Sequence, residues 1–259
     1  MPAGKNILTA IALSACIATP VHADPSGSDD EKWTYSLAPF LWAMNINGSS
    51  TIGPVTAPLE LDFKDDLLDN LDSALMLHFE ANKGPLALFA EYQYSKLKPG
   101  TELPNGATVN VDYKNILGEL GAGYTIDGLN SEATLQVIGG ARYYKQTLDA
   151  AIASGPTLVE VDESWWDVFL GARVLMPLSD KWSLIIRGDG ATGGSNATWH
   201  ASGLFDWRFT NWGSLLLGYR YMNIDYENDK QGRERYAYKA DPQGPLLGLT
   251  FLWENHTAR

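Results

Sequence analysis

Apolar and polar residues alternate along almost the whole chain, from about Trp33 to Trp253. In the segment WSLIIRGD, residues 182–189, three large apolar side chains share one face, and Arg187 and Asp189 share the other. Because side chains of a β-strand point alternately to its two sides, such a segment is a ribbon with one apolar and one polar face. The pattern recurs in about ten segments, and it therefore predicts an all-β fold.

Two architectures share this alternation. A soluble β-sandwich or lipocalin-like barrel buries its apolar faces as a core, whereas a transmembrane β-barrel turns them toward lipid. In this chain the segments follow a leader typical of secretion, and the connections alternate between short turns and long loops. Many of the nine Trp and twelve Tyr lie near segment ends, where such rings favour membrane interfaces. These features favour an antiparallel transmembrane β-barrel of about ten strands, with eight or twelve as alternatives.

Short turns and longer loops separate the expected strands. An even number of strands places both chain ends on one side, which in an outer-membrane barrel is the periplasm. The longer loops would then face outward, at 47–72, 98–106, 147–162, 191–195 and 227–235. The expected strands cover residues 33–46, 73–82, 85–97, 107–125, 131–146, 163–177, 181–190, 196–209, 212–226 and 236–253.

The N-terminal residues have the features of a secretion signal. Lys5 precedes an apolar run that is too short to span a membrane, and small residues stand before a cleavage position after Ala23. Leu13 to Cys16 offers an alternative, because it resembles the four-residue motif that directs lipidation of a cysteine. The expected divisions are a signal peptide at 1–23, a periplasmic tail at 24–32, the outer-membrane barrel at 33–253 and a C-terminal tail at 254–259.

The charge balance narrows the expected partners. The chain has a formal net charge of −12 at pH 7, which disfavours nucleic acid as a partner. We expect a monomer in the outer membrane of a Gram-negative bacterium, in contact with outer-membrane lipid and lipopolysaccharide. The barrel-assembly machinery and small solutes are the other expected partners, and no cofactor is expected.

Charged residues fall on the face of the strands that would line the barrel. They comprise six carboxylates and five guanidiniums, with the acids leading in the first half of the chain and the arginines in the second. Because about ten strands enclose little space, we expect a salt-bridged and largely plugged lumen, either structural or a narrow channel for small solutes. The expected network consists of Glu80, Glu91, Glu119, Arg142, Asp167, Arg173, Arg187, Asp189, Asp206, Arg208 and Arg220.

One strand carries a weak candidate for catalysis. His200 and Ser202 point the same way, with Asp206 further along that face, and a histidine, a hydroxyl and a carboxylate can form a base, a nucleophile and an orienting group. The order His-x-Ser resembles outer-membrane lipid A deacylases, which implies a lipid A-type hydrolase as an alternative function. Two departures count against it: Gly203 stands where those enzymes have Asn, and alternation turns His200 toward the interior.

The first long loop is rich in aspartate. Asp62, Asp65, Asp66 and Asp69 are weak candidates for binding a divalent cation through their oxygens. The competing interpretation is a short amphipathic helix on the barrel rim, because Asp65, Asp69 and Asp72 are spaced to share one helical side. The loops at 47–72 and 147–162 also offer surfaces for an adhesion or binding function, which is the second functional alternative.

Four phrases give a resemblance across most of the chain. They resemble a family of small, uncharacterised proteobacterial outer-membrane barrel proteins of the porin-like kind. The resemblance implies the barrel architecture and assigns no catalytic residue. The phrases are Trp33-x-Tyr35-x-Leu37-x-Pro39-Phe40-Leu41-Trp42-Ala43, Asp167-x-Phe169-x-Gly171-Ala172-Arg173, Leu217-Gly218-Tyr219-Arg220-Tyr221 and Gly244-Pro245-Leu246-Leu247-Gly248-Leu249-x-Phe251.

Overall fold

A computed structural model describes residues 32–102, 108–126, 133–153, 155 and 157–254. The expected signal peptide, the cleavage position at Ala23, Cys16 and nearly all of both expected tails lie outside these residues. No helix in the described ranges is long and apolar enough to cross a membrane.

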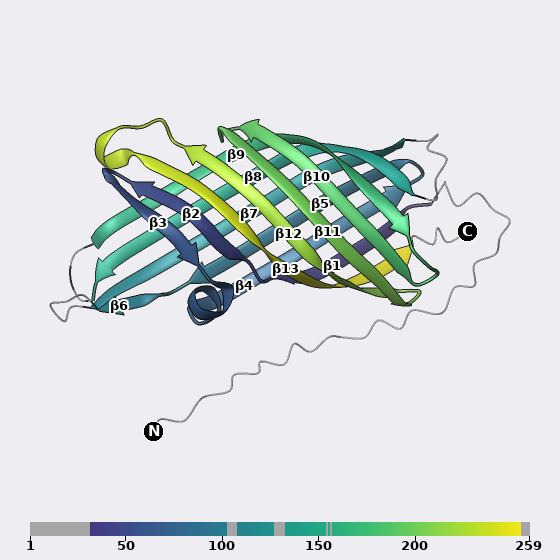
Figure 1. Ribbon diagram of the computed structural model, residues 1–259, viewed down its shortest axis with the longest axis horizontal. Coiled ribbons are helices and arrows are strands. Elements are labelled where there is room, and N and C mark those ends of the chain that lie inside the picture. Colours follow the sequence, from purple (N-terminus) through teal and green to yellow (C-terminus); the bar gives the residue numbers. More distant parts are fainter. Residues whose placement is uncertain (1–31, 103–107, 127–132, 154, 156, 255–259) are drawn as a thin grey trace, which may run out of the picture.

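Ten antiparallel strands form a closed barrel, because the first strand pairs with the last. Figure 1 shows these strands tilted steeply against the long axis of the barrel. The prediction of an antiparallel barrel of about ten strands is therefore confirmed. The strands are β1 (Thr34–Trp42), β4 (Leu71–Lys83), β5 (Leu86–Leu97), β7 (Thr108–Ile126), β8 (Thr134–Ile152), β9 (Thr157–Pro177), β10 (Trp182–Gly193), β11 (Ala197–Thr210), β12 (Gly213–Glu227) and β13 (Tyr236–Glu254).

Three further strands and two short helical segments lie outside this ring. β2 (Asn45–Ile52) pairs with β13 where β1 has ended, and β3 (Val55–Leu61) pairs with β2. β6 (Gly100–Glu102) pairs with β7. The π-helix η2 (Phe63–Leu68) connects β3 to β4, and the 3-10 turn η3 (Gly232–Glu234) lies between β12 and β13.

The barrel is apolar outside and polar inside. On β9, Trp166, Val168 and Leu170 are each more than half exposed, whereas Asp167 and Phe169 between them are almost fully buried. A soluble β-barrel has the opposite arrangement, because its apolar side chains avoid water by turning inward. The alternation in the sequence therefore corresponds to an outer surface suited to lipid.

Aromatic side chains border the apolar outer surface at two levels. Toward the loop end, ring contacts join Tyr143 to Trp166, with centroids 4.7 Å apart, and Trp199 to Tyr221, at 4.5 Å. We call these four residues the loop-end girdle. At the turn end, where β1 begins and β13 ends, two runs of ring contacts form the turn-end girdle. It consists of Trp33, Tyr35, Phe79, Trp253, Trp182, Trp207, Phe209, Trp212 and Phe251.

Several strands extend well past the loop-end girdle. β8 has 19 residues and β9 has 21, about twice the ~9–11 that a tilted strand needs to cross a bilayer. The prediction of a loop at 147–162 is therefore wrong for most of that range, because β8 continues to Ile152 and β9 begins at Thr157. The side chains still alternate there, and each strand provides the hydrogen-bonding partner of the other.

The predicted loop at 47–72 is wrong for a different reason. It contains β2, β3 and η2, and the strand expected at 33–46 is interrupted at Ala43–Met44. β2 is polar and rich in Ser, Asn and Gly, so its own sequence gives little strand signal. It becomes a strand because it extends the sheet along β13, which lies far away in the sequence.

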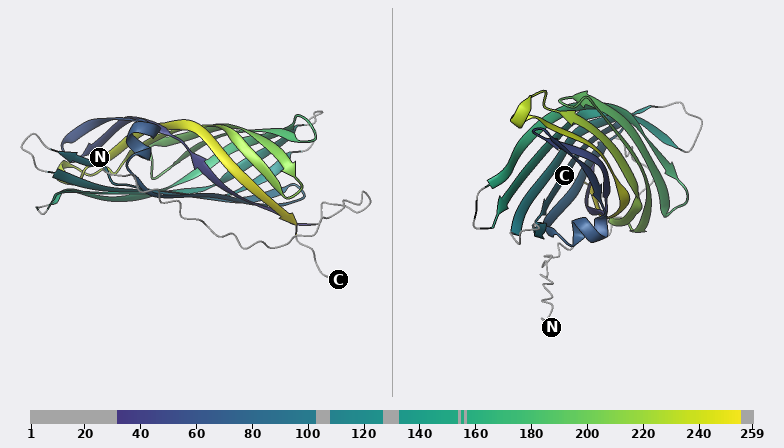
Figure 2. Two further views of the ribbon diagram at one scale, coloured as in Figure 1. Left: turned by 90° about the horizontal axis from the view of Figure 1, so that it is seen from below. Right: turned by 60° about the vertical axis from the view of Figure 1, so that its left-hand side comes forward.

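The barrel wall is interrupted near the loop end, between β3 and β4. β1 pairs with β4 only from Leu77 to Asn82, so residues 71–76 of β4 have a strand partner on the β5 side alone. β3 is the last strand of its side of the sheet and pairs only with β2. The coil of η2 lies at this side of the barrel (Figures 1 and 2).

Candidate functional site: a lumen divided into charged and apolar halves

A ring of ion pairs crosses the lumen. Arg142 on β8 bonds both Glu119 on β7, at 2.6 and 2.8 Å, and Asp189 on β10, at 2.9 Å. Arg187 on β10 bonds the same two carboxylates, at 2.7 and 2.8 Å. The two acids and two arginines thus alternate, and the planar guanidinium suits this because it can bond two carboxylates at once. The side chains of Arg142 and Asp189 are at most 1% exposed, so the centre of this ring is buried.

Two further ion pairs extend the charged layer. Arg220 on β12 makes a two-pronged contact with Glu91 on β5, at 2.7 and 3.1 Å. Arg173 on β9 makes the same kind of contact with Glu80 on β4, at 2.5 and 3.0 Å. His78 lies between the two acids, 3.2 Å from Glu91 and 3.6 Å from Glu80. These pairs tie opposite walls together.

Two phenylalanines fill the space among these charges. The guanidinium of Arg187 lies 5.4 Å from the ring centre of Phe89 and 5.3 Å from that of Phe169. Arg142 lies 5.0 Å from the ring of Phe169, and Arg173 lies 5.8 Å from that of Phe89. Such contacts are favourable because the ring face is electron-rich. We call the ion pairs and these two rings the charged floor.

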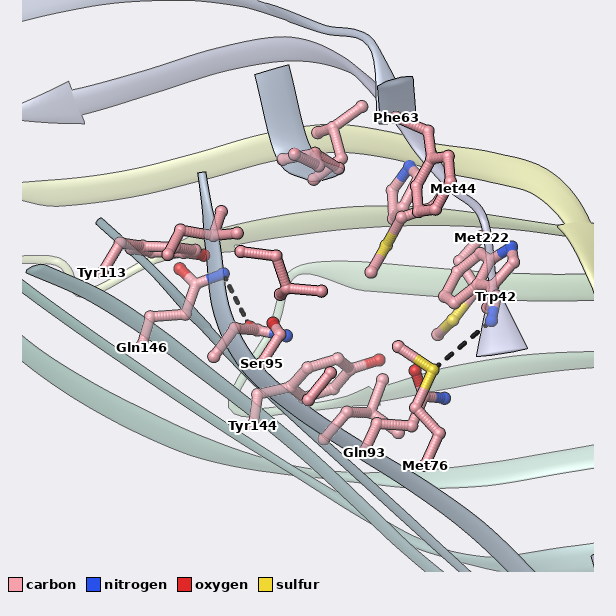
Figure 3. Close-up of a pocket in the computed structure, with 18 of the residues that line it drawn as sticks. Trp42, Met44, Phe63, Met76, Gln93, Ser95, Tyr113, Tyr144, Gln146 and Met222 are labelled. Atoms are coloured by element: carbon pink, nitrogen blue, oxygen red, sulfur yellow. Dashed lines mark hydrogen bonds between the residues drawn. The ribbon is translucent and has the colours of Figure 1, made fainter. Parts of the chain in front are cut away.

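An apolar cavity lies on the loop-end side of the charged floor. Its volume, counted as the space that the centre of a water molecule can occupy, is about 70 Å³, and none of its lining residues is charged. Figure 3 shows Phe63 and Met44 on one side, opposite Met76, Gln93 and Tyr144. The lining residues are Leu41, Trp42, Met44, Ile46, Phe63, Leu67, Leu71, Ala74, Met76, Gln93, Ser95, Leu97, Tyr113, Asn115, Leu117, Tyr144, Gln146, Met222, Ile224, Tyr238 and Pro242.

The few polar groups of the lining face one another or the floor. The Gln93 amide donates to Glu91 at 2.7 Å, and the Gln146 amide donates to Asn115 at 3.5 Å. Among the described residues, no Asp, Glu, Lys, Arg or His lines the cavity, so the cavity carries no charge of its own.

A stack of aromatic rings fills the lumen beside the cavity and toward the loop end. Trp165 on β9 lies between Tyr144, with centroids 4.9 Å apart, and Tyr226, at 3.8 Å. Tyr226 contacts Tyr236 on β13, whose hydroxyl donates to Gln146. We call these four aromatic residues the aromatic stack. Apolar side chains of the β2–β3 hairpin, among them Ile52, pack against the same cluster. The cavity is therefore enclosed between this layer and the charged floor.

The cavity reaches the barrel wall at the interruption between β3 and β4. Leu41 and Ala74 line the cavity and are also exposed on the outside, Leu41 by 45%. On η2, Phe63 and Leu67 line the cavity, and Leu67 is only 7% exposed, whereas the adjacent Leu68 points outward and is 48% exposed. The short helix thus closes the interruption with two apolar side chains.

Polar contacts at both ends hold η2 in place. The backbone N–H of Phe63 donates to the side chain of Asn45 at 2.7 Å. Asn70 donates to the backbone of Asp66, and its own carbonyl accepts from the N–H of Lys98. The Lys98 ammonium donates to Asp72 at 2.8 Å and thereby lowers the pKa of that carboxyl.

The structure places eight of the eleven expected network residues in ion pairs of the charged floor. The other three lie elsewhere. Asp167 is buried but accepts hydrogen bonds from Ser195, at 2.8 Å, and from Thr198, at 3.4 Å. Within the described residues no ion pair joins Asp206 to Arg208, and Arg208 is exposed near the turn end.

The weak catalytic candidates are not assembled into a triad. His200 is buried and its Nδ1 lies 3.0 Å from Asp189, a member of the charged floor. Among the described residues, no hydrogen bond joins His200 to Ser202 or to Asp206. Ser202 lies opposite Arg187 on one neighbouring strand and Arg220 on the other.

The aspartates of the first loop do not form a metal cluster. Asp65 and Asp66 lie on η2, Asp62 and Asp69 cap it, and Asp66 accepts from the backbone N–H of Asp62 at 2.8 Å. No group of three or more His, Cys, Asp or Glu in the described ranges is arranged to hold a metal ion. The expected helix is shorter than its aspartate spacing implies, because Asp72 already belongs to β4.

The cavity was not among the sequence-based expectations, although a signal for it exists. On β7 and β12, inward-facing positions are charged at the level of the floor and become apolar toward the loop end. Glu119 is followed along the inward face of β7 by Leu117, and Arg220 along β12 by Met222 and Ile224. This switch within one face distinguishes a divided lumen from a uniformly polar one.

Comparisons with known proteins concern the fold. No family model matches the sequence, and no curated protein matches it either. The structure is similar to the outer-membrane protease OmpT from Escherichia coli, with a TM-score of 0.51, 4% identity, and coverage of 86% of this chain and 97% of that chain. It also matches the translocator domain of the autotransporter NalP from Neisseria meningitidis, with a TM-score of 0.49, 16% identity, and coverage of 88% and 90%. The likeness to OmpT, together with the closed antiparallel barrel, shows that the chain has the fold of outer-membrane β-barrels.

Proposed function

We propose that the protein is a bacterial outer-membrane barrel that is closed to solutes and binds an apolar small molecule in the outward half of its lumen. The observation that carries the proposal is the uncharged cavity between the charged floor and the aromatic stack. Ligand pockets are typically concave, mostly apolar and lined by a few polar groups, as this cavity is.

Support for the location comes from the outer surface. An apolar band lies between the turn-end and loop-end girdles, as in barrels that cross a membrane. The start of β1, the end of β13 and the short turns then face the periplasm, and the long ends of β7, β8 and β9 project outward. In this orientation the cavity lies at the level of the outer leaflet, and the charged floor lies on its periplasmic side.

Equilibrium binding of an uncharged fluorescent probe tests the proposal. The protein would be refolded into an amphipathic polymer without lipid, and N-phenylnaphthylamine would be titrated into it. We expect a saturable rise in probe fluorescence. Met222→Trp, which fills the cavity from β12, should abolish it, and the smaller change Met222→Phe should weaken it.

Leu217→Trp provides the matched control, because Leu217 lies on the same strand but faces outward. It adds the same ring to β12 and should leave probe binding unchanged. Heat-modifiable mobility in gel electrophoresis shows whether each variant has folded. Folded Met222→Trp protein that binds the probe as well as the unaltered protein would refute binding in the cavity.

A further inference from the structure

The cavity is enclosed along the barrel axis and reaches the exterior through the wall. The charged floor closes its periplasmic side, and the aromatic stack with the β2–β3 hairpin fills the lumen toward the outer end. The interruption between β3 and β4 connects it sideways with the surroundings, through Leu41 and Ala74. A ligand that uses this side opening meets η2 first.

Apolar side chains of the barrel wall border this opening, whereas η2 itself carries exposed charges at Lys64, Asp65 and Asp69. Leu41 lies opposite Leu247 of β13, and Leu247 is half exposed on the lipid-facing surface. Leu75 of β4, next to Ala74, is 48% exposed and lies opposite Tyr94 of β5. The opening therefore begins within the apolar band and extends to about the loop-end girdle. The apolar side chains on both sides of the opening would offer an alkyl chain a path between lipid and the cavity.

The walls suit a slender and flexible chain. Met44, Met76 and Met222 line the cavity, and methionine adapts to irregular apolar partners because it is unbranched and polarizable. The free space is narrow, and Phe63 and Leu67 of η2 occupy its opening. A bound chain would replace the contacts of these two side chains, so η2 would move outward while the ten-stranded barrel stays closed through the β1–β13 pairing.

We propose that the ligand is the alkyl chain of a membrane amphiphile, and that it passes from the outer leaflet into the cavity between β3 and β4 by displacing η2. This inference rests on the proposed function, because it assumes that the cavity binds a ligand. The polar end of the amphiphile stays at the opening, at the level of the lipid head groups. The chain of a free fatty acid and the acyl chain of a phospholipid share this chemistry.

Photo-crosslinking in vesicles tests the route. Palmitic acid with a diazirine at the end of its chain would be dissolved in phospholipid vesicles that contain the full-length barrel. After brief irradiation, mass spectrometry would locate the adducts. We expect adducts on inward-facing Met76 and Met222 in addition to those on the outer surface. A parallel experiment uses a phospholipid with the same diazirine on its acyl chain. Comparing the two shows whether the bound chain comes from a free fatty acid or from a phospholipid.

Variants of η2 separate sideways access from access along the axis. Leu67→Ala removes a side chain that closes the opening, and it should raise the initial rate of inward adduct formation several-fold. Leu68→Ala, on the same helix but facing outward, should leave that rate unchanged. A rate that is the same in both variants and the unaltered protein would overturn the side route.

Strand β4 offers a second matched pair. Ala74→Trp places a ring in the opening and should remove inward adducts, whereas Leu75→Trp places it on the outside and should not. Adducts confined to the outer surface, together with Met222-dependent probe binding, would refute the alkyl-chain ligand while the proposed function stands. If the unaltered protein also fails to bind the fluorescent probe, the proposed function itself is refuted.

Discussion

Arg142 illustrates how single residues hold this barrel together. It is almost fully buried and bonds two carboxylates on different strands. Breaking a buried ion pair leaves the partner charges without compensation, whereas an exposed pair contributes little because water and salt screen it. A positively charged side chain therefore contributes very differently to stability on the two faces of one strand, and β8 provides the comparison.

Replacing Arg142 should be costly. Arg142→Met leaves Arg187 as the one arginine of the described residues that bonds Glu119 and Asp189, and we expect the free energy of unfolding to fall by about 3–5 kcal/mol. Lys145→Met, on the same strand as Arg142, removes an exposed pair with Asp162 of β9 and should cost about 0–1 kcal/mol. Urea unfolding of the refolded protein in lipid vesicles measures both. Equal effects would contradict the role of the charged floor.

Lys98 should control the titration of Asp72. Its hydrogen bond lowers the pKa of the carboxyl, so Lys98→Met should raise that pKa toward the ordinary value of about 3.9. Because the folded-state pKa is the lower one, the contact stabilises the fold above the unfolded-state pKa and is lost as the pH falls through the folded-state value. Carbon-13 NMR of the Asp72 carboxyl in micelles measures the shift, and an unchanged titration would show that the contact is not formed.

At the scale of elements, the β2–β3 hairpin depends on one position where its backbone comes very close to the backbone of β13. Gly48 has a φ of +149°, and a Cβ there would lie 2.0 Å from the carbonyl oxygen of Lys239 on β13. Only glycine fits such a position, because any side chain would collide with the neighbouring backbone. The hairpin is thus attached to β13 at a point that tolerates no substitution, although the barrel closes without it through β1.

Gly48→Ala should detach the hairpin while the barrel stays folded. We expect faster proteolysis within residues 45–61 and unchanged heat-modifiable mobility. Gly203→Ala on β11 is the control, because a Cβ there meets no atom within 4 Å, and its effect on stability should stay within about 0.5 kcal/mol. Proteolysis of the hairpin at the same rate in both variants would show that its attachment does not depend on Gly48.

At the scale of the whole molecule, the lumen has two seals in series. The charged floor and the aromatic stack each cross it, and a narrow barrel leaves little space beside them. A current through the barrel has to pass both. The narrow channel that the sequence suggested as one alternative would therefore need both layers to open.

Planar bilayer recordings test this arrangement. The unaltered protein should be silent, and so should Glu119→Ala/Arg187→Ala, which opens the floor while keeping the Arg142–Asp189 pair. Trp165→Ala/Tyr226→Ala, which opens the stack, should also be silent. We expect discrete current steps only when all four substitutions are combined. Steps from the unaltered protein would contradict a closed lumen.

The sequence by itself determined the barrel. Period-two alternation is a local property, because neighbouring side chains of a strand always point to opposite sides, so the facing of each side chain and the approximate number of barrel strands follow from it. It also placed Glu119, Arg142 and Arg220 on the inside, since a charge on the lipid face is costly. These conclusions need no knowledge of which strand lies next to which.

Tertiary structure decided the partners and the cavity. Glu91 meets Arg220 across 129 positions of the sequence, and Glu80 meets Arg173 across 93, which alternation cannot specify. The polar segment Asn45–Ile52 became a strand only because β13 offered it a free edge. The cavity and its side opening exist because that hairpin follows β13 and leaves β4 without a neighbour on one side. Such features depend on the register between distant strands, and only the closed barrel fixes that register.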